Sequence, residues 1–172
     1  YNSLYTQCGM TGYDAARRIL DENGLYDISI EQIPGELSDH YDPKAKVIRL
    51  SQKVYTSSSA AAVGIASHEA GHAVQHAKNY FPIRIRQAII PITQFGSSAA
   101  MPLFLIGMIF ASATLMYLGI AFYSLAVLFQ LVTLPVEFNA SARAMKAIRT
   151  SGRLTDKEMQ ASRRVLTAAA LT

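Results

Sequence analysis

The sequence has almost no cysteine and contains a long stretch without charge. One cysteine, Cys8, occurs among 172 residues, so an internal disulfide is excluded and nothing indicates an oxidising compartment. No signal peptide, internal repeat or low-complexity linker is visible. The chain begins at Tyr1 rather than Met and stops inside an apolar helical pattern, so we expect it to be a piece of a longer protein. Its length is enough for one domain with its own core.

The uncharged stretch extends from Gln87 to Val136, where 50 residues include no Asp, Glu, Lys, Arg or His. One membrane-spanning helix needs about 20 apolar residues, so the stretch is long enough for two. The alternative is a buried soluble core, but such a core hardly leaves so long a segment without charge. We therefore predict a transmembrane helical hairpin with spans near residues 89–109 and 115–134 and a turn around residues 112–114.

Basic residues lie on both sides of this hairpin, whereas the predicted turn has none. They are Lys78, Arg84, Arg86, Arg143, Lys146, Arg149 and Arg153. By the positive-inside rule both flanks are cytoplasmic. Together with the hairpin, this predicts an integral protein of the cell membrane whose active site faces the cytoplasm. These residues explain most of the net charge of +4, and we expect them to face the anionic head groups of the lipid bilayer. Nucleic acid is therefore not an expected partner.

The rest of the sequence predicts a small α+β unit. Capping-box spacing opens helices at Thr11 and at Thr155, where an acidic residue follows three positions later. Alternating patterns and turn residues predict two strands, at 28–33 and 46–50, with a turn at 41–43. Further helices are expected at residues 57–78 and 137–150. We expect a mainly helical α+β chain in three parts: residues 1–86, the transmembrane hairpin 87–136, and residues 137–172.

The segment His68-Glu69-Ala70-Gly71-His72 predicts a metal site in the helix at 57–78. Its two imidazoles project from one helical face and could bind a single zinc ion, while Glu69 could accept a proton from water. Random placement would give this pattern about 0.003 times in such a chain. The alternative is two histidines on the polar side of a helix, without a metal.

Zinc in a hydrolase is held by three protein ligands, so a third ligand must lie elsewhere. His76 is too far, because positions i and i+8 are about 12 Å apart and a zinc–nitrogen bond is about 2 Å. The metzincin pattern is also absent, since Gln75 and Lys78 stand where it needs Gly and His. The remaining carboxylates stay open as candidates: Glu22, Glu31, Glu36, Glu137, Glu158 and six aspartates.

Glu137 stands out because it directly follows the apolar stretch. Two membrane spans would return the chain to the membrane face that holds the His68–His72 helix, whereas one span would separate the ligands. The competing interpretation is a simple helix N-terminal residue, favoured by the helix dipole.

Four segments carry a resemblance to a known family: LSDHYDP at 37–43, VIRLS at 47–51, HEAGHAVQH at 68–76 and FQLVTLPVEFNAS at 129–141. The chain resembles the YugP-type family of bacterial membrane-associated neutral zinc metallopeptidases, through nearly all of its length. More distantly it is similar to the HtpX and CAAX prenyl protease membrane zincins. The resemblance implies an α+β zincin-like fold with the membrane hairpin between the ligand segments. It also implies one zinc ion per chain held by His68, His72 and Glu137, a gluzincin-type set, with Glu69 as general base.

The distant relatives usually carry Asp four residues after the ligating Glu, where this chain has Ser141. Asn139 is then the candidate to support a zinc-binding histidine. His40, Tyr41 and Arg143 are candidates for stabilising the oxyanion, although a structural role near a turn is an equal alternative for His40. Zincins usually lay the substrate along an exposed strand, and residues 46–50 are the candidate edge.

Together these patterns predict a zinc-dependent membrane endopeptidase that hydrolyses peptide bonds at the cytoplasmic membrane face. Its partners would be protein or peptide substrates, with membrane proteins among the candidates. A catalytically inactive, metal-binding membrane scaffold or interaction protein is the alternative, and a fourth protein ligand such as His76 would favour it. A membrane protein without metal, with an accidental motif, is the third class.

Overall fold

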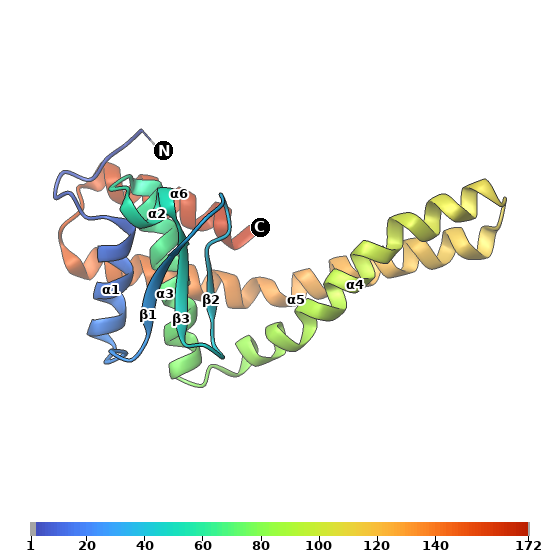
Figure 1. Cartoon of the computed structure of the whole chain (residues 1–172), viewed down its shortest axis with the longest axis horizontal. Helices are drawn as coiled ribbons and strands as arrows, with labels where there is room; N and C mark the ends of the chain where they lie inside the picture. Colours follow the sequence, from blue (N-terminus) through green and yellow to red (C-terminus); the bar gives the residue numbers. More distant parts are fainter. Residues whose placement is uncertain (1–2, 172) are drawn as a thin grey trace. The chain divides into compact units, whose positions relative to one another are not determined.

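The structure is a computed structural model that describes residues 3–171. In chain order the elements are α1 (Gly12–Glu22), β1 (Ser29–Ile33), β2 (His40–Asp42), β3 (Val47–Ser51), α2 (Gln52–Thr56), α3 (Ala60–Ala77), α4 (Phe81–Ile109), α5 (Ala113–Ser151) and α6 (Asp156–Leu171) (Figure 1). The chain divides into two compact units. One unit joins the segment up to Tyr80 with the segment from Glu137 on, and the other contains Phe81–Val136. The prediction of a mainly helical chain with a small sheet is confirmed.

The capping boxes that the sequence predicts are both present. The Asp14 backbone N–H donates to Thr11 Oγ1 at 3.2 Å, and the Thr11 N–H donates to Asp14 Oδ2 at 3.1 Å. At the start of α6 the Thr155 N–H donates to Glu158 Oε2 at 2.9 Å. Because these bonds satisfy N–H groups that a helix start leaves open, they fix where α1 and α6 begin.

The sheet has β3 at its centre, with β1 parallel on one side and β2 antiparallel on the other. The prediction that residues 46–50 form an exposed edge is therefore wrong. The strand β2 includes Tyr41 and Asp42, so the prediction of a turn at residues 41–43 is wrong for these two residues. The turn begins after Asp42, whose Oδ1 accepts from the backbone N–H groups of Lys44 and Ala45 at 2.9 and 3.1 Å. This Asx-type turn lets β2 pair back onto β3, so the exposed edge on that side belongs to β2.

The register of the sheet separates two faces. Ile30, Ile48 and Tyr41 are aligned across the three strands, and they face the hydrophobic core of this unit. Glu31, Arg49 and His40 are the next aligned row and therefore point to the opposite face. The row of Glu31, Arg49 and His40 thus lies on the outer side of the sheet, and the row of Ile30, Ile48 and Tyr41 faces the core.

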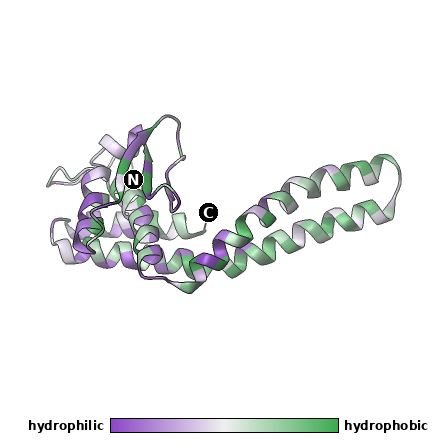
Figure 2. Ribbon diagram, turned by 60° about the horizontal axis from the view of Figure 1, so that its bottom comes forward, coloured by the Kyte–Doolittle hydropathy of each residue, from purple (hydrophilic) through white to green (hydrophobic). Residues whose placement is uncertain are grey.

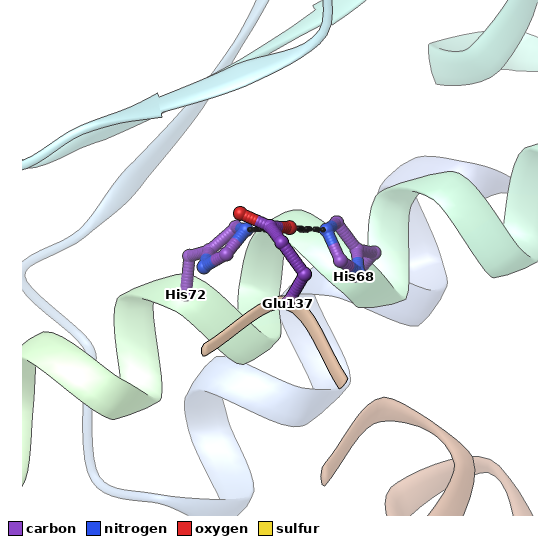
Figure 3. Close-up of side chains that lie close together, drawn as sticks. All are labelled: His68, His72 and Glu137. Atoms are coloured by element: carbon purple, nitrogen blue, oxygen red, sulfur yellow. Dashed lines mark hydrogen bonds and ion pairs between the residues drawn. The ribbon is translucent and has the colours of Figure 1, made fainter. Parts of the chain in front are cut away.

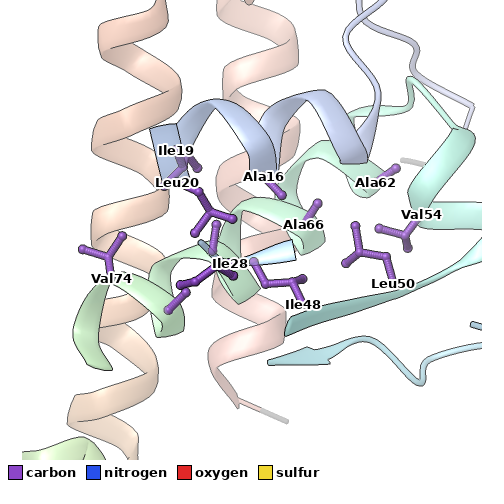
Figure 4. Packing of buried hydrophobic residues seen from close by; sticks show 12 residues of the cluster. Ala16, Ile19, Leu20, Ile28, Ile48, Leu50, Val54, Ala62, Ala66 and Val74 are labelled. Carbon is purple, nitrogen blue, oxygen red and sulfur yellow. The ribbon is translucent and has the colours of Figure 1, made fainter. Parts of the chain in front are cut away.

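The core lies between the inner face of the sheet, α1 and α3 (Figure 4). Its buried members are Ala16, Ile19, Leu20, Ile28, Ile48, Leu50, Val54, Ala62, Ala66, Ala70, Ala73 and Val74. Helix α3 contributes mainly alanines, whose small side chains let α1 and the sheet approach its backbone closely. It begins at Ala60, after the Ser59 cap, rather than at residue 57, because the separate short helix α2 precedes it.

Helix α5 is continuous from Ala113 to Ser151, so the prediction of a separate helix starting at residue 137 is wrong. Pro135 lies inside it. A proline removes one backbone hydrogen bond, but an apolar helix continues through it when the neighbouring groups compensate. Glu137 therefore lies well inside a helix, and the interpretation of Glu137 as a helix N-terminal residue is excluded.

The second unit consists of α4 and the first part of α5, joined by a turn at residues 110–112. By length and composition both helices could cross a membrane, with mean hydropathies of 1.5 and 2.0 in their most apolar windows. Only 6% and 11% of the residues in these windows are buried, whereas the core helix of a soluble protein is mostly buried. Figure 2 shows apolar residues along both helices of this unit.

Candidate metal centre

Two histidines from α3 and a glutamate from α5 converge on one point (Figure 3). His68 Nε2 lies 3.1 Å from His72 Nε2 and 3.1 Å from Glu137 Oε2, and His72 Nε2 lies 3.4 Å from the same carboxylate oxygen. The side chains of His68, His72 and Glu137 are 6%, 8% and 12% exposed. Among residues 3–171 these three form the cluster of His, Cys, Asp and Glu side chains that could hold a metal ion.

The two helices meet closely where they carry the cluster. A Cβ atom at Gly71 would lie 2.6 Å from the backbone oxygen of Ala140, which is closer than real Cβ atoms come to other atoms. Because residue 71 is glycine, the backbones of α3 and α5 can touch at this point. On α3 the contact lies between His68 and His72, and on α5 it lies between Glu137 and Ser141. This approach brings together residues that lie 65 or more positions apart in the sequence.

The second ring nitrogen of each histidine has a partner that fixes its proton. Ser141 Oγ donates to the carbonyl oxygen of Leu166 at 3.0 Å, so it accepts from His68 Nδ1, also at 3.0 Å. His72 Nδ1 lies 3.0 Å from Gln75 Oε1, an oxygen that only accepts. Both neutral imidazoles therefore carry hydrogen on Nδ1. Their Nε2 lone pairs point into the cluster, as metal-binding histidines require.

The donor set fits a zinc ion. Two bare imidazole nitrogens and a carboxylate oxygen at 3.1 to 3.4 Å repel one another unless a cation lies between them. A tetrahedral zinc ion with bonds of 2.0–2.2 Å holds its ligand atoms about 3.3 Å apart. The separations in the cluster match this value, and three protein ligands leave the fourth position open for water or substrate.

Glu69 lies between the two histidines in the chain and belongs to the electrostatic environment of the cluster. Burial raises the pKa of its carboxyl group above the usual value. The charges of His72 and His68 oppose this rise, while the carboxylates of Glu137 and Asp39 add to it. A carboxyl group that responds to all three cluster residues is suitably placed to exchange protons beside them.

The structure separates the remaining candidates into two groups. Asn139 and Arg143 are linked to the cluster, because Asn139 Oδ1 accepts from Arg143 Nε at 2.8 Å and from Gln75 Nε2 at 3.0 Å. Gln75 in turn accepts from His72. Ser141, treated in the sequence as a departure from the pattern, contacts His68 directly. Gln75 was missed, although its position three residues after His72 places both on one helical face.

His40 and Tyr41 lie on strand β2, away from these bonds. His40 is exposed on the outer face of the sheet, where Nδ1 donates to the Ser38 carbonyl at 2.7 Å and Nε2 lies 3.5 Å from Arg49 Nη1. Tyr41 faces α3, and its ring lies 5.5 Å from that of His76. Burial, with the charges of Asp27 and Asp42, raises the pKa of Tyr41, so its hydroxyl keeps its proton at neutral pH.

A His-Glu-x-x-His helix whose histidines meet a glutamate from a later helix is the arrangement of a zinc metallopeptidase centre. Comparison with known proteins agrees. Residues 1–172 match the family described as "Putative neutral zinc metallopeptidase", and the chain belongs to that family. It is 49% identical to the "Putative membrane protease YugP" of Bacillus subtilis (strain 168) over 172 residues, which cover the whole chain and 76% of that protein. No solved structure matches the chain, so the zincin-like fold stays a prediction.

Proposed function

We propose that the chain is a zinc-dependent membrane endopeptidase that cleaves peptide bonds at the cytoplasmic membrane face. One observation carries the proposal: the Nε2 atoms of His68 and His72, with their protons directed to the opposite side of each ring, meet the Glu137 carboxylate within 3.4 Å. Such a set would bind one zinc ion per chain. The family membership and the similarity to a protein named as a membrane protease support the same function.

The roles of the side chains follow from their positions. When bound, zinc supplies a Lewis acid that polarises a carbonyl group and lowers the pKa of water beside it. Glu69 then accepts a proton from the attacking water and returns it to the leaving amine. Burial raises the pKa of Glu69, which favours the protonated carboxyl group that returns the proton to the amine.

A peptide substrate would align with the exposed edge of β2. This edge belongs to a strand whose inner face packs toward α3, the helix that carries the two histidines. Backbone hydrogen bonds to an edge strand hold an extended peptide without a strong demand on its side chains. Protein or peptide substrates, membrane proteins among them, fit this mode of binding. The hydroxyl of Tyr41 on β2 remains a candidate donor to the oxyanion.

Replacing Glu69 by Gln tests the proposed reaction, with the zinc-loaded protein in detergent and fluorescently labelled casein as substrate. The wild type should cleave casein and lose this activity with a chelator. Glu69→Gln should keep its zinc and lose cleavage. Equal cleavage by both proteins would refute the role of Glu69. If the zinc-loaded wild type did not cleave casein, the inactive scaffold would be favoured. Among the described residues, however, the cluster contains three possible metal ligands and not the four of a closed site.

The cytoplasmic orientation has a separate test, because the one natural cysteine, Cys8, is exposed in the unit that contains the cluster. In intact cells a membrane-impermeant maleimide should leave Cys8 unlabelled until the membrane is permeabilised. A Cys8→Ser protein that also carries Ser112→Cys, in the hairpin turn, should be labelled without permeabilisation. The reverse pattern would place the metal centre outside the cell.

A further inference from the structure

The orientation of the Gln75 side chain decides which nitrogen of His72 carries hydrogen. If Gln75 turned its amide over, Nε2 of Gln75 would donate to His72 Nδ1, and the hydrogen of the neutral ring would move to His72 Nε2. That atom could then no longer bind a metal. Gln75 is fully buried, so bulk water cannot replace the bond that the turned amide would lose. Something in the structure must therefore select one orientation.

The Gln75–Asn139 pair cannot select it alone. In the observed arrangement Gln75 Nε2 donates to Asn139 Oδ1 at 3.0 Å and Gln75 Oε1 accepts from His72 Nδ1 at 3.0 Å. If both amides turned over, Asn139 Nδ2 would donate to Gln75 Oε1 and Gln75 would donate to His72. Both arrangements contain the same number of hydrogen bonds between these three residues, so the bonds among these three do not by themselves distinguish the two arrangements.

Arg143 removes this ambiguity. Its Nε donates to Asn139 Oδ1 at 2.8 Å, and a guanidinium group has donors only. Asn139 must therefore present its oxygen, which obliges Gln75 to present nitrogen to Asn139 and oxygen to His72. Arg143 is itself held in place, because its guanidinium lies 5.8 Å from the centre of the Tyr80 ring. The Tyr80 N–H donates to the Gln75 carbonyl oxygen at 2.9 Å, which ties this ring to the end of α3.

We propose that Arg143 is a positioning residue that sets the direction of hydrogen bonding through Asn139 and Gln75 and so keeps His72 Nε2 free of hydrogen. The inference rests on the proposed zinc site, but its central claim concerns the metal-free chain. Arg143 does not need to touch the metal or the substrate for this role. It would act as a fixed hydrogen-bond donor to Asn139. Asn139 and Gln75 would pass this direction on to His72, the proposed metal ligand.

The test uses Arg143→Met and the double variant Arg143→Met/Asn139→Asp. Arg143→Met removes the donor that obliges Asn139 to present its oxygen, so His72 should populate both tautomers. Zinc affinity should fall by about 10-fold, the lower end of the range for loss of a partner behind a ligand. A carboxylate at position 139 only accepts, so it should force Gln75 to donate even without Arg143. The double variant should therefore recover the wild-type tautomer and most of the zinc affinity.

Two measurements on the detergent-solubilised chain separate the outcomes. Long-range ¹H–¹⁵N spectra of the histidine rings, recorded without zinc at a pH where they are neutral, report the tautomer of His72. Competition with a fluorescent chelator reports the zinc affinity. Arg149→Met, which removes an exposed arginine from the same helix, is the matched control and should change neither.

An unchanged tautomer in Arg143→Met would overturn the proposal. Failure of Asn139→Asp to restore it would also overturn the proposal, because Arg143 would then act only by packing on Tyr80. The spectra need neither zinc nor substrate. If the wild type bound no zinc or cleaved nothing, the proposed function would fail, but the tautomer result would still decide the role of Arg143.

Discussion

Gly71→Ala should separate the metal ligands while leaving the fold intact. The added Cβ would lie 2.6 Å from the Ala140 oxygen, about 0.8 Å short of the 3.4 Å at which ordinary contact begins. Backbone atoms cannot rotate away, so α3 and α5 must move apart by a similar distance. Metal sites tolerate ligand displacements of only about 0.2 Å. We therefore expect zinc affinity to fall by about 10- to 100-fold, the range for disturbing the support of a ligand.

The fold should survive this substitution. Alanine in place of a helical glycine gains about 1 kcal/mol, and overpacking costs about 1–3 kcal/mol, so the net loss is at most about 2 kcal/mol. Typical domains have about 5–15 kcal/mol in reserve. Thermal unfolding of the metal-free protein would measure the loss, and chelator competition would measure zinc binding.

Gly64→Ala is the matched control, because Gly64 is also buried in α3. Its Cβ would lie 3.4 Å from Val165 Cγ1, an ordinary contact. This variant should gain about 1 kcal/mol of stability with unchanged zinc affinity. Wild-type zinc affinity in Gly71→Ala would refute the argument that the close approach of α3 and α5 assembles the site. A loss of zinc in both variants would refute it as well, because the effect would not depend on Ala140.

Three further predictions concern Ser141, Glu158 and Glu137. Ser141→Ala removes the acceptor of His68 Nδ1 and should weaken zinc binding by about 10-fold or more in chelator competition. The control is Ser162→Ala, which removes another buried bond from a hydroxyl to a carbonyl group and should lower only the melting temperature. Equal effects of the two serines on zinc would contradict the tautomer assignment. Glu158→Ala should destabilise the protein by about 2 kcal/mol in denaturant unfolding, since the buried carboxylate accepts from the backbone N–H groups of both Gln7 and Thr155. Removal of zinc by a chelator should lower the melting temperature of the wild type but not that of Glu137→Ala; a shared shift would count against Glu137 as a ligand.

Local patterns in the sequence predicted most elements of the fold. Thr11 and Thr155 begin their helices where the capping boxes indicate, because the bonds that fix a helix start join residues only three apart. The errors occurred where distant parts of the chain decide. Residues 46–50 have the pattern of any half-buried strand, and only pairing with β2 and β1 makes β3 central. The sequence also predicted a break between a span ending near residue 134 and a helix at 137–150, but α5 is continuous through Pro135.

The candidate site shows the same division. The spacing of His68 and His72 indicated their shared face, and the position of Glu137 after an uncharged stretch made it the preferred carboxylate. The residues behind the ligands were harder to recognise. The role of Ser141 depends on a carbonyl of α6, and that of Gln75 on a side chain from α5, so neither could be read from local spacing. Ordinary polar residues acquire such roles only through the packing of helices.

The order of the ligands along the chain has a consequence for biosynthesis. His68 and His72 are synthesised before the apolar hairpin and Glu137 after it, and chains are made from the N-terminus at about 5–20 residues per second. A nascent chain whose apolar hairpin is still being made therefore holds two of the three donors. The proposed centre is completed only when α5 has left the ribosome and docked on α3. Under the proposed function, the chain would stay inactive until its apolar hairpin had been made, which would protect neighbouring nascent proteins from premature cleavage.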